Sequence, residues 1–134
     1  MENKKIDLSE ESLKQKLTQE EYDVLRKGGT EAPFSGKYYT ETSEGAYNCK
    51  VCNNPLFYSD MKYHSDTVGL RGWPSFDKAI PGSIEERDDT TLGMYRREIV
   101  CAVCKSHLGH VFPDDDSKTG THYCINSVCL DLEK

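Results

Sequence analysis

Four of the six cysteines form two pairs of identical spacing, Cys49-Lys-Val-Cys52 and Cys101-Ala-Val-Cys104. A Cys-x-x-Cys turn places two thiolates on one side, and two such turns that face each other make a tetrahedral cage of sulfur atoms, which suits Zn²⁺. Because four sulfurs leave no open position for water, we expect one structural zinc ion per chain. A redox Cys-x-x-Cys normally begins a helix and an iron–sulfur cluster usually has tighter spacing, so both alternatives fit less well.

The remaining cysteines, Cys124 and Cys129, lie near the C-terminal end of the chain. A cysteine nucleophile needs a nearby imidazole or cation, because the free thiol has a pKa of about 8.5 and the reactive form is the thiolate. His107 and His110 follow the second cysteine pair, and His122 precedes Cys124 by two residues. The sequence therefore indicates a thiol site, although each histidine could equally be a buried, hydrogen-bonded residue.

Two further residues belong with these candidates. Asn126 follows Cys124 by two positions, so both side chains would point to the same face of a strand. Trp73 is the only tryptophan and stands in the motif Gly-Trp-Pro-Ser-Phe, although a tryptophan taken alone is more often a core residue than a substrate contact. His107 and His110 would share a face on a helix or a turn, whereas a strand would need a bulge or turn between them.

Short elements must position these residues, because turn residues interrupt the chain repeatedly from residue 34 onward. This pattern predicts a mainly β fold of antiparallel strands with short helices at the N-terminal end. Thr18-Gln-Glu-Glu21 is a capping box and predicts a helix that ends at Gly28-Gly29, while residues 1–16 would add a short helix or a flexible extension. Strands are expected at residues 37–40, 46–49, 93–103 and 122–130.

Composition excludes several classes of protein. At 134 residues the chain is long enough for one domain, residues 1–134, and too short for two ordinary ones. A net charge of −6 gives no support for nucleic-acid binding, and no apolar run is long enough to span a membrane. Residues 1–10 carry no apolar signal-peptide core, so we expect a cytoplasmic protein whose cysteines are metal ligands or reactive thiols.

In their order along the chain, Gly-Trp-Pro-Ser-Phe, the two Cys-x-x-Cys pairs, His-Leu-Gly-His-Val-Phe and Tyr-Cys-Ile-Asn-Ser resemble the methionine sulfoxide reductase B family. Residues 17–34 also resemble the opening segment of that family, so the resemblance covers about residues 17–130. It implies two antiparallel sheets with zinc held away from the active site. It also implies an enzyme that reduces the R epimer of methionine sulfoxide, free or in proteins, to methionine.

By this resemblance, Cys124 is the nucleophile that attacks the sulfoxide sulfur and is left as a sulfenic acid. His107, His110 and Asn126 line the site, and one of the two histidines donates the proton that the departing oxygen needs. Trp73 cradles the methyl group of the substrate. Thioredoxin or another thiol reductant would regenerate the enzyme, which we expect to be a monomer that repairs oxidised proteins.

His122 departs from the family pattern, since relatives usually have arginine two residues before the nucleophile. Arginine is always charged, whereas histidine is only partly charged near neutral pH. We therefore place His122 in the substrate-binding part of the site and expect a more pH-dependent thiolate. The substitution His122→Arg should then raise activity more at pH 8 than at pH 6.

Cys129 is the only thiol without another assignment, because residues 65–72, where relatives often carry a resolving cysteine, contain none. On a straight strand Cys124 and Cys129 would lie about 16 Å apart and face opposite sides. A disulfide needs Cα atoms within about 7 Å, so Cys129 resolves Cys124 only if the chain bends or opens locally. Alternatively, Cys129 is a small buried apolar residue and an external thiol attacks the sulfenic acid.

Two other functions fit part of these observations. One is a non-enzymatic, zinc-bearing β binding module in which Cys124 is inert and the histidines are structural. The other is a zinc-dependent redox chaperone whose cysteine pairs open on oxidation. An assay on both epimers of a methionine sulfoxide peptide separates them, since only the reductase would convert the R form and lose that activity in Cys124→Ser.

Overall fold

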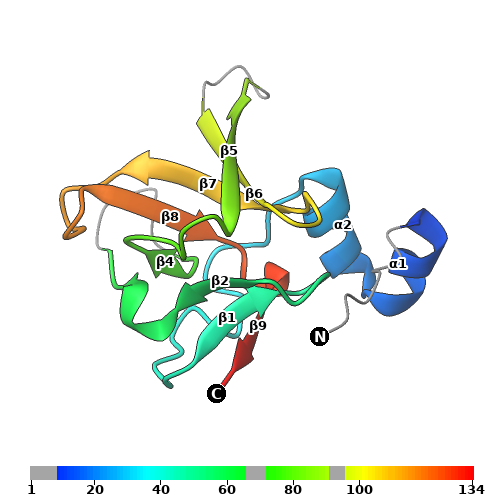
Figure 1. Ribbon diagram of the computed structural model, residues 1–134, viewed down its shortest axis with the longest axis horizontal. Helices are drawn as coiled ribbons and strands as arrows, with labels where there is room; N and C mark the ends of the chain where they lie inside the picture. Colours follow the sequence, from blue (N-terminus) through cyan, green and yellow to red (C-terminus); the bar gives the residue numbers. More distant parts are fainter. Residues whose placement is uncertain (1–8, 66–71, 91–95) are drawn as a thin grey trace.

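Two antiparallel sheets and two short helices make up the computed structural model, which describes residues 9–65, 72–90 and 96–134 (Figure 1). The expected mainly β fold with short N-terminal helices is therefore confirmed. Within the described ranges, no helix is both long and apolar enough to cross a membrane. Residues 1–8, which belong to the expected N-terminal extension, lie outside these ranges.

Capping residues define the principal helix. α1 spans Glu10–Lys16 and α2 spans Gln19–Lys27. Thr18 Oγ1 accepts a hydrogen bond from the Glu21 amide at 3.1 Å, and Glu21 Oε1 accepts one from the Thr18 amide at 2.9 Å, which confirms the predicted capping box. Gly28 ends α2 with φ of +75°, a left-handed conformation that glycine adopts without steric cost.

The smaller sheet contains three strands in the order β2–β1–β9. Their bounds are β1 Ala46–Cys49, β2 Pro55–Tyr58 and β9 Leu130–Glu133, so the strand predicted at residues 46–49 is confirmed. Tyr47 and Phe57 are fully buried on its inner face. The ring of Phe57 stacks on Phe76 of the second sheet with centroids 4.2 Å apart, and this aromatic contact joins the sheets in the core.

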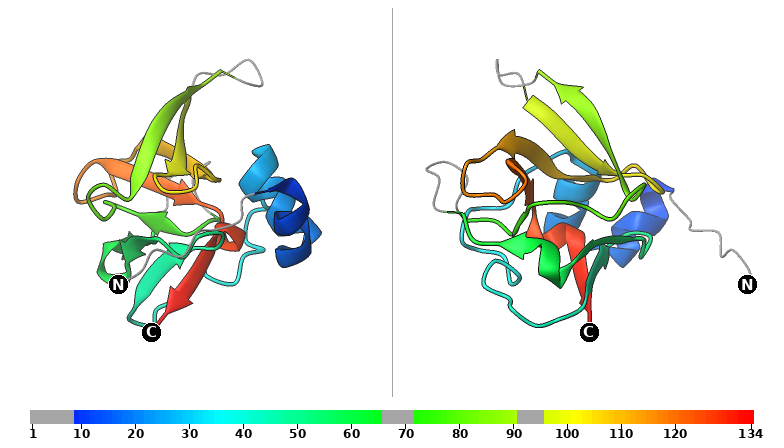
Figure 2. Two further views of the ribbon diagram at one scale, coloured as in Figure 1. Left: turned by 45° about the vertical axis from the view of Figure 1, so that its right-hand side comes forward. Right: turned by 60° about the vertical axis from the view of Figure 1, so that its left-hand side comes forward.

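The larger sheet contains six strands in the order β3–β4–β8–β7–β6–β5. Their bounds are β3 Lys62–Tyr63, β4 Ser75–Phe76, β5 Ile84–Asp89, β6 Arg96–Cys101, β7 His107–Pro113 and β8 Thr121–Ile125. The outer β5–β6 hairpin projects from the body of the molecule, whereas β7 and β8 lie inside the sheet (Figures 1 and 2). The central strands β7 and β8 carry most of the candidate thiol site.

The segment at residues 37–40 forms turns, so the strand predicted there is wrong. The Tyr39 amide donates to the Gly36 carbonyl at 3.3 Å, and the Glu41 amide donates to the Tyr38 carbonyl at 3.2 Å. These bonds join residues three apart and curl the backbone, which prevents strand pairing.

The segment at residues 122–130, predicted as one strand, is divided into β8, the 3₁₀ helix η3 (Ser127–Cys129) and β9. The Lys50 amide donates to the Cys129 carbonyl at 2.9 Å and so directs the chain into the smaller sheet. The prediction of one continuous strand from Cys124 to Cys129 is therefore wrong. Of the strand predicted at residues 93–103, residues 96–101 form β6 and residues 102–103 form a turn. Residues 93–95 of that prediction, and residues 66–71 of the cysteine-free loop, lie outside the described ranges.

Candidate metal centre and candidate active site

The four paired cysteines converge on one point. Their Sγ atoms all lie within 4.8 Å of one another. The sulfur atoms of Cys49 and Cys104 are 3.6 Å apart, as are those of Cys52 and Cys101. A tetrahedron with zinc–sulfur bonds of about 2.3 Å has edges of about 3.8 Å. The donor set and its size therefore fit a four-coordinate metal ion, and this cluster can bind one.

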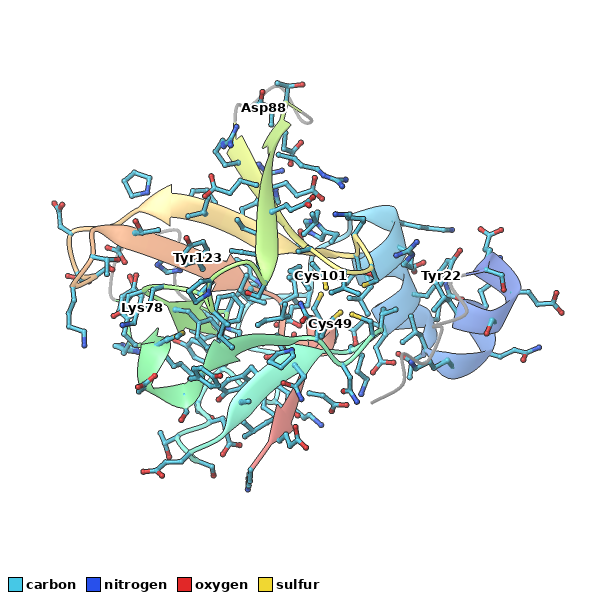
Figure 3. All side chains as sticks on the ribbon, viewed as in Figure 1. Tyr22, Cys49, Lys78, Asp88, Cys101 and Tyr123 are labelled. Atoms are coloured by element: carbon cyan, nitrogen blue, oxygen red, sulfur yellow. The ribbon has the colours of Figure 1, made fainter. Side chains whose placement is uncertain are left out.

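The cluster joins the ends of both sheets, with Cys49 and Cys101 side by side (Figure 3). Cys49 ends β1 of the smaller sheet, and Cys101 ends β6 of the larger one. Arg26 on α2 supports the second pair by donating from Nη1 to the Cys104 carbonyl at 3.2 Å and to Ser106 Oγ at 2.8 Å. A metal ion here would therefore hold β1, β6 and α2 together.

Cys124 lines a cavity of about 120 Å³ that is separate from the cluster. Among the residues around it are Trp73, Arg96, His110, Phe112, Cys124 and Asn126. The structure thus brings Cys124, Trp73, His110 and Asn126 to one cavity. His107 and His122 are not among the described residues that line it.

Strand pairing places these side chains on one face. Cys124 on β8 stands opposite Ser75 on β4 and opposite His110 on β7, and opposed residues of antiparallel strands present their side chains on the same side. Gly109 allows β7 to approach β8, since a Cβ at this position would collide with the Cys124 carbonyl oxygen.

A β-bulge in β7 brings His107 and His110 together. The register shifts between Val100 and Ile99 of β6, which pair with His107 and Gly109, so β7 has one extra residue here. The two imidazole rings meet edge to face, with an interplanar angle of 67° and centroids 5.4 Å apart. The prediction that a strand would need a bulge between the histidines is confirmed.

Carboxylates hold both of these histidines. His107 Nδ1 lies 2.7 Å from Glu98 Oε2, and His110 Nε2 lies 2.8 Å from Asp89 Oδ2. Arg96 also donates to Asp89 Oδ2, at 3.2 Å, so Arg96, Asp89 and His110 form a chain beside the cavity. Burial lowers the pKa of His110, and the hydrogen bond to Asp89 offsets this only in part.

Cys124 is held as a thiol in this arrangement. Burial, and secondly the negative charge of Glu31, raise the pKa of Cys124 to about 12. The reactive thiolate therefore needs a nearby positive charge, and among the described residues of the cavity wall Arg96, and His110 when it is protonated, can supply one.

His122 is fully buried, with 0% of its surface exposed, so it has no surface that could touch a substrate. Its Nδ1 is 2.8 Å from the Tyr63 hydroxyl and 3.1 Å from Asp114 Oδ2, while its Nε2 is 3.2 Å from Ser75 Oγ. Burial lowers the pKa of His122, and the hydrogen bond to Asp114 offsets this only in part. His122 thus links β8 to Ser75 on β4 and to Tyr63 on β3 inside the protein, which corrects its expected place in the substrate-binding part of the site.

Glu31 is a further residue of the site that sequence reasoning missed. Its amide donates to Asn126 Oδ1, its carbonyl accepts from Trp73 Nε1, and its Oε1 accepts from the Val128 amide, each at 3.0 Å. Asn126 Nδ2 donates in turn to the Leu108 carbonyl at 2.9 Å, so the Asn126 amide anchors backbone on two sides. Glu31 therefore fixes the positions of Trp73 and Asn126 around Cys124.

The other missed residues, Asp89, Arg96, Glu98 and Asp114, stand in charged runs of the sequence that resemble ordinary solvated surface. The available signal was the two-residue spacing of Arg96 and Glu98, which places both side chains on one face of β6.

Cys129 is fully buried, and its Sγ donates to the His107 carbonyl at 3.3 Å. Burial raises the pKa of Cys129 well above its ordinary value. These features agree with the alternative of a small buried residue, and attack on Cys124 would require η3 to open.

The fold and the cavity define a β protein whose thiol site stands apart from its cysteine cluster. Residues 17–134 match the SelR domain family. A peptide methionine sulfoxide reductase MsrB from Pseudomonas savastanoi pv. phaseolicola is 50% identical over 129 residues, covering 96% of this chain and 95% of the relative. MsrB proteins from Agrobacterium fabrum (46% over 130 residues, 96% and 93% covered) and Methanosarcina barkeri (47% over 134 residues, 99% and 92% covered) are similarly related. The chain belongs to this family, and the resemblance seen in its motifs is confirmed.

Proposed function

We propose that this protein is a methionine sulfoxide reductase that converts the R epimer, free or within polypeptides, to methionine, with Cys124 as nucleophile. The observation that carries the proposal is the cavity in which Cys124 meets Trp73, His110 and Arg96. A methyl sulfoxide presents an apolar methyl group and a polar oxygen on the same sulfur. The indole face matches the methyl group, and the imidazole and guanidinium groups match the oxygen.

The first step transfers oxygen from the substrate to Cys124. The thiolate attacks the sulfoxide sulfur and forms a sulfur–sulfur bond while the oxygen takes up a proton. The resulting hydroxyl group then passes to the Cys124 sulfur, as the sulfur–sulfur bond and the bond between the oxygen and the substrate sulfur break. Thiolate, sulfoxide and one proton thus become methionine and a Cys124 sulfenic acid. Arg96 offers a fixed positive charge to the thiolate, which burial otherwise disfavours.

His110 is the proton donor in this proposal, because it lines the cavity and His107 does not. Asp89 favours the charged imidazolium form through its contact with Nε2, and His107 supports the ring from the side. Asn126 and Glu31 keep the surrounding loop in place.

Thiols complete the cycle. One thiol converts the sulfenic acid to a mixed disulfide and water, and a second thiol attacks this disulfide and releases Cys124. The net reaction consumes two thiols for each sulfoxide reduced. We propose thioredoxin or another thiol reductant as their source and a cytoplasmic monomer as the working form. Cys129 would supply the first thiol only after η3 opens.

For the cysteine cluster we propose one structural zinc ion. Four thiolates whose sulfur atoms all lie within 4.8 Å of one another suit zinc and leave no position for a reacting group, so the metal takes no part in oxygen transfer. Elemental analysis of the purified protein should find one zinc per chain, and a protein purified without metal whose Tm does not rise when zinc is added would contradict the assignment.

The test of the activity uses both epimers of a methionine sulfoxide peptide with dithiothreitol as reductant. Wild type should reduce only the R epimer, and Cys124→Ser should abolish the reaction, while Cys129→Ser should retain a single-turnover burst of methionine. Binding of sulfoxide without turnover would support the binding module instead. Zinc release by peroxide that switches on chaperone activity would support the redox chaperone.

A further inference from the structure

Phe34 is one of the most exposed large apolar side chains in the described ranges, with 63% of its surface exposed. The Ser35 amide donates to the Ala32 carbonyl at 3.3 Å and closes a turn with Pro33 and Phe34 at its centre. Phe34 has φ of +66°, which the third position of a type II turn normally gives to glycine. A bulky residue is rare there, because its Cβ is crowded by the backbone. The turn thus holds an aromatic ring toward solvent at a conformational cost.

This turn runs along the loop that carries Trp73. The Phe34 amide donates to the Gly72 carbonyl at 2.7 Å, and the Glu31 carbonyl accepts from the Trp73 indole at 3.0 Å. Thr30, one residue earlier, lines the cavity of Cys124. Phe34 therefore stands at the edge of the proposed active site.

A second cavity continues the surface on the other side. The ring of Phe34 packs edge to face against Tyr39, with centroids 5.3 Å apart. Tyr39 and Trp73 both line a cavity of about 450 Å³, and Trp73 also lines the cavity of Cys124. Aromatic surface thus extends from the reacting centre through Trp73 to Tyr39 and Phe34.

A polypeptide substrate of the proposed enzyme would itself reach this aromatic surface. A methionine sulfoxide within a polypeptide brings flanking residues with it, at about 3.3–3.6 Å per residue in an extended chain. We propose that Phe34 and Tyr39 bind an apolar side chain next to the methionine sulfoxide in an unfolded segment of an oxidised protein. This inference rests on the proposed function and extends it to the choice among protein substrates.

The chemistry of the surface favours an apolar residue next to the oxidised methionine. Ala32 and Pro33 are exposed beside Phe34, so the turn offers an apolar patch. The net charge of −6 disfavours acidic segments. Two aromatic rings bury an aliphatic or aromatic side chain favourably, and partial burial of one leucine strengthens binding by about fivefold to tenfold.

The experiment compares three substrates: N-acetyl-methionine (R)-sulfoxide, a pentapeptide with glycine on both sides of the oxidised methionine, and one with leucine on both sides. For wild type, KM should be about fivefold to tenfold lower with the leucine peptide than with the glycine peptide. Phe34→Ala should remove this preference and leave kcat/KM for the N-acetyl substrate within about twofold. Phe34→Tyr should restore the preference, and Tyr58→Ala on β2, at a position 48% exposed, is the matched control.

Phe34→Gly separates the effect of the aromatic ring on binding from the effect of the backbone conformation on stability, because glycine adopts a positive φ without strain and has no ring. It should lose the leucine preference with unchanged or higher thermal stability. Equal loss of kcat/KM on all three substrates, or an unchanged leucine preference in Phe34→Ala, would overturn the inference. If wild type reduced none of the substrates, the proposed function itself would fail, which is a different result.

Discussion

Single side chains set the reactivity of Cys124. Burial and the Glu31 carboxylate oppose its thiolate, whereas a positive charge on Arg96 or His110 in the cavity wall would favour it. These groups come from separate segments of the chain, so a substitution at any one of them should shift the pKa of the Cys124 thiol.

Iodoacetamide should therefore alkylate Cys124 slowly at neutral pH. Only the thiolate reacts, and burial raises the pKa of Cys124 to about 12, so the rate should rise about tenfold per pH unit up to about pH 10. Mass spectrometry of the Cys124 peptide from metal-loaded protein measures the rate. Arg96→Met should slow alkylation about tenfold by removing a fixed charge. A plateau near pH 8 would mean that the thiolate is already formed.

The burial of His122 changes what its substitution should do. Because burial lowers the pKa of His122, the imidazole carries less positive charge than a free histidine at either pH. The larger effect of His122→Arg at pH 8 that the sequence suggested no longer follows, and His122 affects stability instead.

Stability should fall as the pH is lowered from 7 to 5, in part because of His122. An unfolded histidine takes up a proton near pH 6.5, but His122 in the folded protein does so at lower pH. The unfolded state thus binds more protons in this range and is favoured. His122→Gln should be less stable than wild type by about 1–3 kcal/mol at pH 7 and should lose less on acidification. Urea unfolding at both pH values tests this, and an equal loss in both proteins would contradict it.

Among the elements, β7 and β8 position the site residues through a bulge and a close approach of their backbones. The bulge turns His107 toward His110, and Gly109 lets the two strands approach.

Gly109→Ala should destabilise the protein by about 2–4 kcal/mol and reduce activity, because the new Cβ would press on the Cys124 carbonyl. Gly82→Ala is the matched control, since Gly82 has φ of +77° but open space around it. Its cost should be only about 1–2 kcal/mol. Chemical unfolding measures both, and equal costs would show that the close approach is unimportant.

Elements with local signals were predictable from the sequence, and elements defined by distant contacts were not. α2 and β1 agree with their predictions because a capping box and a glycine mark the ends of α2, and turn residues lie on either side of β1. β5 is charged and largely exposed, and β7 is buried over four successive residues, so neither shows the simple alternation of a strand. The break after β8 depends on Glu31 and Lys50, which are far away in the chain.

The candidate site follows the same division. The spacing of the cysteines predicted the metal cluster, and the sequence motifs predicted Cys124, His110 and Trp73 as site residues. The carboxylates that hold the histidines lie on other strands, and only strand pairing reveals them.

For the whole molecule, the cysteine cluster is the point where both sheets and α2 meet. Removal of its metal by a strong chelator should lower Tm by about 10 °C or more, since a structural metal site contributes several kcal/mol to folding. Cys101→Ser should have the same effect, whereas Cys124→Ser should keep both metal and Tm. Differential scanning calorimetry with metal analysis tests this, and an unchanged Tm in the metal-free protein would contradict it.

The convergence of the cysteines also has a kinetic consequence. Cys52 and Cys101 are separated by residues 53–100, yet they meet at one centre. An unfolded chain that already holds the metal begins with this loop closed, so the search that brings β1 to β6 is shorter. Refolding should then be faster when zinc is present from the start than when it is added afterwards, and the two sheets would assemble outward from the metal.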